Sequence, residues 1–210
     1  MWWGLKNKGD SWYNGTDSLD TEAEGVRNLK DKQQKERKKV QGSYEHVTHE
    51  FGPVYDGTSK ILILGSLPSV KSREQQFYYG HPQNRFWKVL ASVLEAKEVP
   101  DTIEKKRRLL LANRIALWDV IESCDIIGSA DSTIKNVKEN DMRVILGTAP
   151  IRAVFTNGAK ADTLFHKYCR ESCEIGIPVV KLPSTSPANA AWNVERLITV
   201  WKEEIGKYLI

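Results

Sequence analysis

The sequence predicts an α/β protein, a three-layer α/β/α sandwich with a central, mostly parallel four-stranded sheet. Short runs of consecutive apolar residues alternate along the chain with segments whose apolar residues recur at helical spacing. Runs that are apolar on both faces are typical of buried parallel strands, because helices cover both faces of such a sheet. Each candidate strand also ends in a polar or glycine-bearing segment.

Composition places the chain among folded proteins. Of its 210 residues, 40% are hydrophobic and 28% are charged, which is enough apolar material for a core. No apolar run approaches the ~18–20 residues of a membrane span, and no secretory signal is readable at the N-terminus. Three cysteines cannot build a disulfide framework. We therefore expect a cytoplasmic, intracellular protein with no membrane partner.

The first 43 residues differ from the rest of the chain. They contain several turn formers and a charge run at residues 30–39, with six basic and two acidic side chains. Such a run is typical of a solvated helix or a mobile arm, and less often of a tail that tracks phosphates. We predict a charged N-terminal extension over residues 1–43 and one domain over residues 44–210. The net charge of +4 favours a polyanionic partner without establishing one.

The first half of the domain supplies two strands and two helices. Residues 60–65 are a continuous apolar run that ends in glycine, as a buried strand does. Residues 85–94 carry apolar side chains at helical spacing, and residues 103–112 form a second helix with basic residues on its polar side. Residues 115–121 are again continuously apolar apart from one aspartate, and we predict a second strand there.

The second half repeats the alternation of helix and strand. The expected strands are residues 153–156 and 177–182, and the expected helices are residues 141–146, 159–169 and 190–208. A glycine and then a proline follow the first of these helices, which are ordinary stop signals. The last helix is amphipathic and places its large apolar residues on one face.

Four strand-end segments are candidates for a ligand site. They are residues 65–69, Asp119, residues 157–158 and residues 183–187. In parallel sheets, ligands bind beyond the carboxyl ends of the strands. We therefore expect these four segments to converge on one rim.

Several familiar sites are absent from the sequence. It contains neither a phosphate-binding P-loop nor a Gly-x-Gly-x-x-Gly turn, and no Gly-x-Ser-x-Gly nucleophile elbow. His46 and His49 are three residues apart, but no third metal ligand accompanies them at a readable spacing. The sequence therefore argues against a metal centre.

Two loops carry residues suited to nucleic acids. Residues 77–87 could form an ordinary turn with Asn84 as a helix cap, or could offer aromatic faces and amide groups to a planar base. Residues 182–190 could be the capped start of the last helix, or a stiff, hydroxyl-rich loop that grips phosphates. The residues alone leave these alternatives open.

Three motifs, in this order, resemble those of the uracil-DNA glycosylase superfamily. They are Gly-Ser-Leu-Pro-Ser at residues 65–69, His-Pro-Gln-Asn-Arg-Phe-Trp at residues 81–87 and Pro-Ser-Thr-Ser-Pro-Ala-Asn at residues 183–189. The second motif is similar to that of the mismatch-specific uracil/thymine branch. The first and third look most like the hypoxanthine-DNA glycosylase (deoxyinosine glycosylase) family. The resemblance covers about residues 51–208.

The resemblance implies a monofunctional DNA glycosylase of base-excision repair. Such an enzyme flips a deaminated base out of double-stranded DNA and hydrolyses its N-glycosidic bond, without a metal or cofactor. The base expected here is hypoxanthine. A mismatch-specific uracil-DNA glycosylase and a non-catalytic DNA-binding relative are the alternatives. We expect the protein to act as a monomer, associated with the nucleoid when it works on DNA.

The resemblance also implies a role for each candidate residue. Most relatives place Asn or Asp at the position of Ser66 to position the attacking water. A serine hydroxyl is a poor base near pH 7, so the main catalytic role moves to Asn84, which would orient the water. The expected base-binding residues are Phe77, Tyr78, Asn157 and Ser69. The expected DNA contacts are Ser184, Thr185, Ser186, Pro187, Asn189, Lys71, Arg73 and Lys160.

Overall fold

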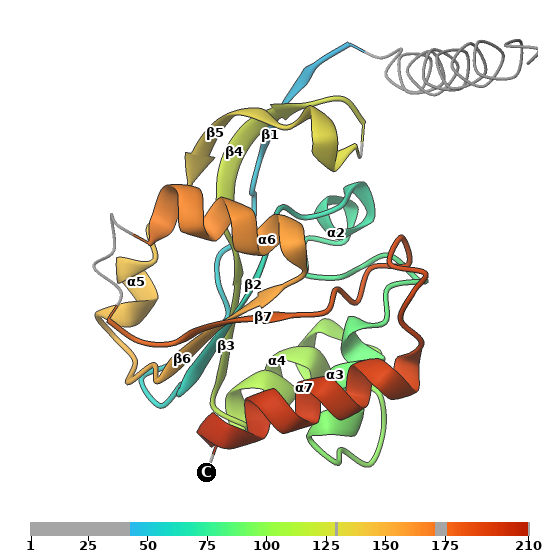
Figure 1. Ribbon diagram of the computed structural model, residues 1–210, viewed down its shortest axis with the longest axis vertical. Coiled ribbons are helices and arrows are strands. Elements are labelled where there is room, and N and C mark those ends of the chain that lie inside the picture. The colour runs from blue at the N-terminus through green and yellow to red at the C-terminus, as the bar shows by residue number, and fades with distance from the viewer. Residues whose placement is uncertain (1–42, 129, 171–175, 210) are drawn as a thin grey trace, which may run out of the picture. The chain divides into compact units, whose positions relative to one another are not determined.

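Four short parallel strands form the centre of the molecule in the computed structural model, which describes residues 43–128, 130–170 and 176–209. They pair in the order β3-β2-β6-β7 (Figure 1) and are β2 (Ile61–Gly65), β3 (Ile115–Asp119), β6 (Ala153–Asn157) and β7 (Val179–Leu182). Every residue of β2 and β3 is buried, which explains why neither sequence alternates. The predicted parallel sheet is confirmed.

Helices cover both faces of this sheet, as Figure 1 shows. One face carries α3 (Phe86–Val93), α4 (Ile103–Ala112) and α7 (Val194–Leu209), and the other carries α5 (Arg143–Leu146) and α6 (Ala159–Leu164). A π-helical turn, Phe165–Cys169, continues α6. The expected three-layer α/β/α architecture is therefore present.

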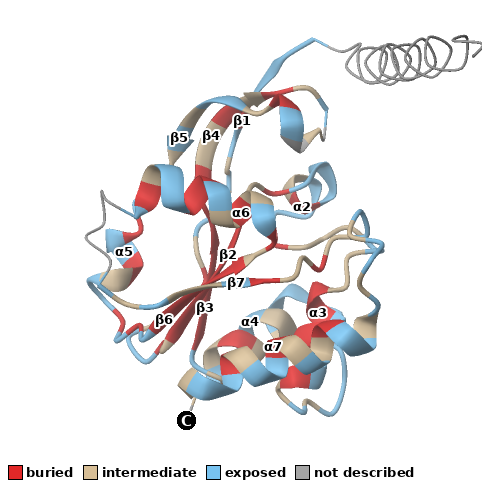
Figure 2. Cartoon of the chain, viewed as in Figure 1, coloured by how far each residue is buried: buried red, intermediate tan, exposed pale blue. Residues whose placement is uncertain are grey.

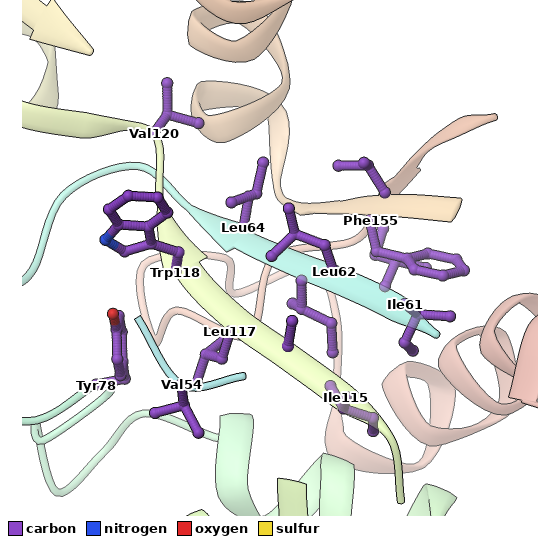
Figure 3. Close-up of a cluster of buried hydrophobic side chains, with 14 of the residues drawn as sticks. Val54, Ile61, Leu62, Leu64, Tyr78, Ile115, Leu117, Trp118, Val120 and Phe155 are labelled. Atoms are coloured by element: carbon purple, nitrogen blue, oxygen red, sulfur yellow. The ribbon is translucent and has the colours of Figure 1, made fainter. Parts of the chain in front are cut away.

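Apolar side chains between these layers form the core (Figures 2 and 3). On α7, Leu197, Trp201 and Ile205 are four residues apart and therefore share the face that is buried. The Trp201 ring meets Phe86 of α3 edge-on, with 5.8 Å between ring centroids. Its indole N–H donates to the carbonyl of Pro183 at 3.0 Å, which ties α7 to the loop that follows β7.

A second sheet, which the sequence analysis did not predict, is antiparallel. Its order is β1-β4-β5, and its strands are β1 (Glu45–Thr48), β4 (Ile121–Ile126) and β5 (Lys135–Glu139). Only some of the β4 residues are buried, and every residue of β5 is at least partly exposed, so neither strand has a continuous apolar run. Residues 115–121, predicted as one strand, instead pass from one sheet to the other at Val120.

Other boundaries shift for local reasons. A short helix not predicted, α2 (Val70–Glu74), begins where the Ser69 hydroxyl accepts from the Ser72 N–H at 3.2 Å. The last helix begins at Val194, later than expected, because Asn193 Oδ1 accepts the Arg196 N–H at 2.9 Å in the manner of a helix cap.

The predicted extension over residues 1–43 lies outside the described residues, apart from Ser43. Among the helices that the structure describes, none has the length and apolar character needed to span a bilayer.

Gly158 allows the end of β6 to lie tightly against the loop that follows β7. Its φ of +98° and ψ of 167° lie in a region that side chains disfavour. A Cβ at this position would lie 2.7 Å from the Cβ of Ser184. The Gly158 N–H also donates to the Leu182 carbonyl at 3.0 Å, so the backbone cannot easily move away.

We expect Gly158→Ala to lower the free energy of unfolding by about 1–3 kcal/mol, through backbone strain and the contact with Ser184. The matched control is Gly206→Ala in α7, where a Cβ would meet nothing within 4 Å. That change should raise the free energy of unfolding by about 0.5–1 kcal/mol, since alanine is the better helix former. Urea unfolding measures both, and equal effects would contradict the strain at Gly158.

Candidate active site

A cavity of about 590 Å³ lies at the carboxyl ends of the parallel strands. Residues 65–69, Asp119, residues 157–160 and the loop after β7 contribute to its wall, together with residues from the segment that precedes α3. The four strand-end segments therefore converge, as parallel strands require.

Thr185 joins the two asparagines of the candidate site. Its hydroxyl donates to Asn84 Oδ1 at 3.1 Å and accepts from Asn157 Nδ2 at 3.0 Å. Its backbone N–H donates to Asn157 Oδ1, also at 3.0 Å. Thr185 is fully buried, whereas both asparagines border the cavity. The network thus fixes the amide planes of residues that are far apart in the sequence.

These bonds decide which groups the asparagines present to a ligand. Asn84 Oδ1 also accepts the Phe86 N–H at 2.9 Å, so both of its lone pairs are engaged. Within the described part of the chain, no hydrogen bond holds Asn84 Nδ2, which therefore presents N–H donors to the cavity. Asn157 uses one N–H and one lone pair for Thr185, and its side chain also lies near the Tyr79 hydroxyl. The bond to Phe86 ties Asn84 to the first residue of α3, as the turn interpretation expects, while the residue also borders the cavity.

Arg85 holds the loop of residues 184–189 in place, a role the sequence analysis did not assign. Its guanidinium donates to four backbone carbonyl groups, those of Thr185 at 3.2 Å, Asn189 at 3.1 Å, Ser186 and Trp192. Its backbone N–H also donates to the Thr185 carbonyl, at 3.1 Å. Arginine suits this position because its five donors are held in one plane.

The same loop is braced by its own side chains. Ser184 Oγ accepts the Ser186 N–H at 3.2 Å, and Asn189 Nδ2 donates to the Ser184 carbonyl at 2.9 Å. Ser184, Ser186, Pro187 and Asn189 border the cavity, but Thr185 does not. Thr185 therefore cannot contact DNA as expected, because its hydroxyl points into the protein and serves the two asparagines.

The aromatic segment needs a correction as well. Phe77 is 1% exposed and does not border the cavity, since its ring is stacked beside Trp87 with 6.0 Å between centroids. Stacking on a base is thus ruled out for Phe77 by its position in the core. Tyr78 and Tyr79 do line the cavity, although Tyr78 is itself nearly enclosed.

Tyr79 lies in a strained backbone conformation, with φ of +52°, and its ring is parallel to that of Phe86 at 3.8 Å. Burial, reinforced by the carboxylate of Asp119, raises the pKa of the Tyr78 and Tyr79 hydroxyl groups. Both phenols are therefore neutral at physiological pH. Tyr79 belongs to the segment whose aromatic faces are predicted to suit a base, although it is not among the four expected base-binding residues.

Ser66 and Ser69 both line the cavity. The Ser66 carbonyl accepts the Ile121 N–H at 3.0 Å, which anchors the loop to the start of β4. The Ser69 hydroxyl is already engaged as the cap of α2 and lies 3.0 Å from Ser72 Oγ. Of the two side-chain hydroxyl groups, that of Ser66 is thus the less constrained.

The three basic candidates are placed differently. Arg73 and Lys160 border the cavity, and Lys71 does not. Lys71 Nζ forms an exposed ion pair with Glu74 at 2.6 Å. Arg73 donates to the Pro68 carbonyl at 3.3 Å, so its guanidinium is partly engaged. A phosphate contact stays a prediction for Lys160, on α6, and for Arg73, on α2.

Replacing Thr185 by valine keeps the shape of the side chain and removes its hydroxyl. We expect the free energy of unfolding to fall by about 1–3 kcal/mol, because Asn84 and Asn157 each lose a partner in a poorly hydrated place. Thr185→Ser keeps the hydroxyl and should recover most of this loss. Denaturant unfolding compares the three proteins, and a valine variant as stable as the native protein would contradict the network.

Two curated proteins are similar to this chain in sequence. A hypoxanthine DNA glycosylase of Methanosarcina acetivorans is 37% identical over 147 residues, which cover 70% of this chain and 90% of the relative. A hypoxanthine DNA glycosylase of Methanosarcina barkeri is 37% identical over 112 residues, or 53% of this chain and 71% of the relative.

A solution NMR structure of a Methanosarcina acetivorans protein assigned to the uracil DNA glycosylases is also similar. It superposes with a TM-score of 0.63 at 36% identity, over 73% of this chain and 92% of that one. The model of the uracil DNA glycosylase superfamily matches residues 53–204. The resemblance noted in the sequence is confirmed, and the chain belongs to the uracil DNA glycosylase superfamily.

Proposed function

We propose that this protein is a DNA glycosylase that hydrolyses the N-glycosidic bond of deaminated bases, with hypoxanthine as its main substrate. The observation that carries the proposal is the 37% identity to a hypoxanthine DNA glycosylase over 90% of that relative's length. The cavity that unites Ser66, Asn84 and Asn157 supports the same conclusion, because these are the residues to which the resemblance assigns the chemistry.

Catalysis requires that the nucleotide leave the duplex, since the sugar carbon is out of reach in stacked DNA. A cavity of about 590 Å³ is within the range that accepts small ligands, and it can receive one nucleotide. Tyr79, which is partly exposed, supplies aromatic surface for the base, whereas Tyr78 is only 1% exposed. Asn157 can read the base edge with the N–H and the lone pair that Thr185 leaves unused.

Asn84 then positions the attacking water. Its Nδ2 group donates to the water oxygen and directs a lone pair toward C1′ of the sugar. The transition state of glycosidic hydrolysis resembles an oxocarbenium ion, so a weakly activated nucleophile is sufficient. The geometry of the water and the stabilisation of the departing base supply the acceleration.

The loop of residues 184–189 would press on the DNA backbone next to the flipped nucleotide. Its stiffness comes from Arg85, which bonds to its carbonyl groups. Lys160 and Arg73 add positive charge at the rim of the cavity. We place the protein on double-stranded DNA inside the cell, working as a monomer.

A second candidate substrate is uracil in a mismatch. The structure assigned to the uracil DNA glycosylases, at 36% identity, favours it. Ser66 argues for hypoxanthine, because it stands where the uracil-specific relatives carry the residue that positions water.

Duplexes with a single inosine, uracil or xanthine test the proposal. We expect alkali-sensitive strand scission at inosine, faster than at uracil or xanthine.

Asn84→Ala should slow scission by at least about 100-fold, because the water loses its position, and should change DNA binding only slightly. Asn113→Ala, at the end of α4 and outside the cavity, is the matched control and should cleave normally. Absence of scission at inosine by the native protein would refute the main proposal.

Salt dependence tests the phosphate contacts. Lys160→Ala should weaken binding to every duplex and reduce the slope of log K against log salt by about 1. Lys71→Ala removes an equal charge that is already paired with Glu74 and lies outside the cavity, so it should leave the slope unchanged. Identical slopes for the two variants would argue against a phosphate contact at Lys160.

A further inference from the structure

Asp119 is a buried carboxylate in the cavity wall that the mechanism above does not use. Its side chain is 5% exposed, and its Oδ2 atom accepts from His49 Nε2 at 3.0 Å. No hydrogen bond engages the other oxygen, Oδ1, within the part of the chain that the structure describes. Among the described residues, the fully enclosed side-chain atoms that lack a partner are His49 Nδ1 and Tyr79 Oη. Asp119 Oδ1 is not one of them, so it keeps access to the cavity that Asp119 lines and can accept a hydrogen bond there.

The backbone places Asp119 Oδ1 against the first of the three motifs, residues 65–69. Asp119 is the last residue of β3 and lies opposite Gly65 in the parallel register. A Cβ on Gly65 would be 2.0 Å from Asp119 Oδ1, so only glycine leaves room for the carboxylate there. Ser66 follows directly, and its carbonyl is held by Ile121 just beyond Asp119. The carboxylate thus lies beside the motif whose usual water-positioning residue is replaced by serine.

The attacking water gives up a proton during the reaction, and Asn84 cannot accept that proton. Both lone pairs of Asn84 Oδ1 are engaged by Thr185 and Phe86, which leaves only donor groups for the water. Asp119 lines the same cavity as Asn84, and a carboxylate oxygen can accept a proton.

His49 holds this carboxylate in place. A carboxylate can only accept, so His49 Nε2 carries the proton of the bond to Asp119. The His49 side chain is 1% exposed and packs against Phe51, with 4.4 Å between ring centroids, and against Tyr78. His49 precedes the matched superfamily region, residues 53–204, so the side chain that holds the Asp119 carboxylate lies outside that region.

We propose that Asp119 is the general base of the reaction and that His49 is its positioning residue; the inference rests on the proposed glycosylase function. Asp119 Oδ1 takes a proton from the water held by Asn84, and the water oxygen forms a bond to C1′. The bond from C1′ to the base nitrogen breaks, and its electron pair leaves with the base. The base then takes a proton from solvent, and Asp119 releases its own.

Asp119→Asn, which keeps the shape of the side chain, tests the assignment in single-turnover cleavage of an inosine duplex. A general base contributes about 10²- to 10⁴-fold, and we expect a loss of that size with the melting temperature and binding to a non-cleavable 2′-fluoro analogue unchanged. Asp125→Asn is the matched control, since Asp125 also pairs with a histidine, His46, at 2.9 Å, but outside the cavity. It should cleave at the native rate.

A second variant separates proton transfer from structural support. In Asp119→Ala, sodium formate should restore part of the lost rate, whereas it should not rescue Asn84→Ala. His49→Phe should lower the cleavage rate less than Asp119→Asn does and leave binding unaltered.

Three results would overturn the assignment. They are an Asp119→Asn rate within about threefold of the native rate, a loss of analogue binding that parallels the loss of rate, and no rescue by formate. Failure of the native protein to cleave inosine is a separate outcome, because it refutes the proposed function itself.

Discussion

The candidate site depends on hydrogen bonds that converge on one short loop. Thr185 bonds to Asn84 and Asn157 through its hydroxyl, and Arg85 bonds to the carbonyl groups of the same loop. These contacts join the segment before α3, the end of β6 and the loop after β7. Without them, three separate loops would each be free to move, and no amide would have a defined direction.

The site also depends on close packing of backbone at two glycines. Gly65 leaves room for the Asp119 carboxylate, and Gly158 leaves room for Ser184. At both positions a methyl group would occupy space that a neighbouring strand end already fills. The spacing of the parallel strands therefore sets how closely Asp119 approaches Gly65 and how closely Ser184 approaches Gly158.

The antiparallel sheet also contributes residues to the wall of this cavity and to the contacts behind it. The chain passes from β3 to β4 immediately after Asp119, and Ile126 of β4 lines the cavity. His49 follows β1 and reaches Asp119 from that side. The site thus combines the N–H donors of Asn84, whose amide bonds to Thr185 after β7, with the carboxylate of Asp119, which accepts from His49 after β1.

The parallel sheet, its helices and the rim where the motifs meet could be predicted from the sequence, because continuous apolar runs and helical periodicity are local properties. The sequence also singled out Asn84, Asn157 and the loop of residues 184–189. It did not reveal the antiparallel sheet, whose half-exposed strands lack an apolar run. The folded chain was needed to show that Thr185 and Phe77 are buried, that Arg85 bonds to a distant loop and that His49 bonds to Asp119. Those outcomes depend on contacts between residues far apart in the chain, which no local pattern encodes.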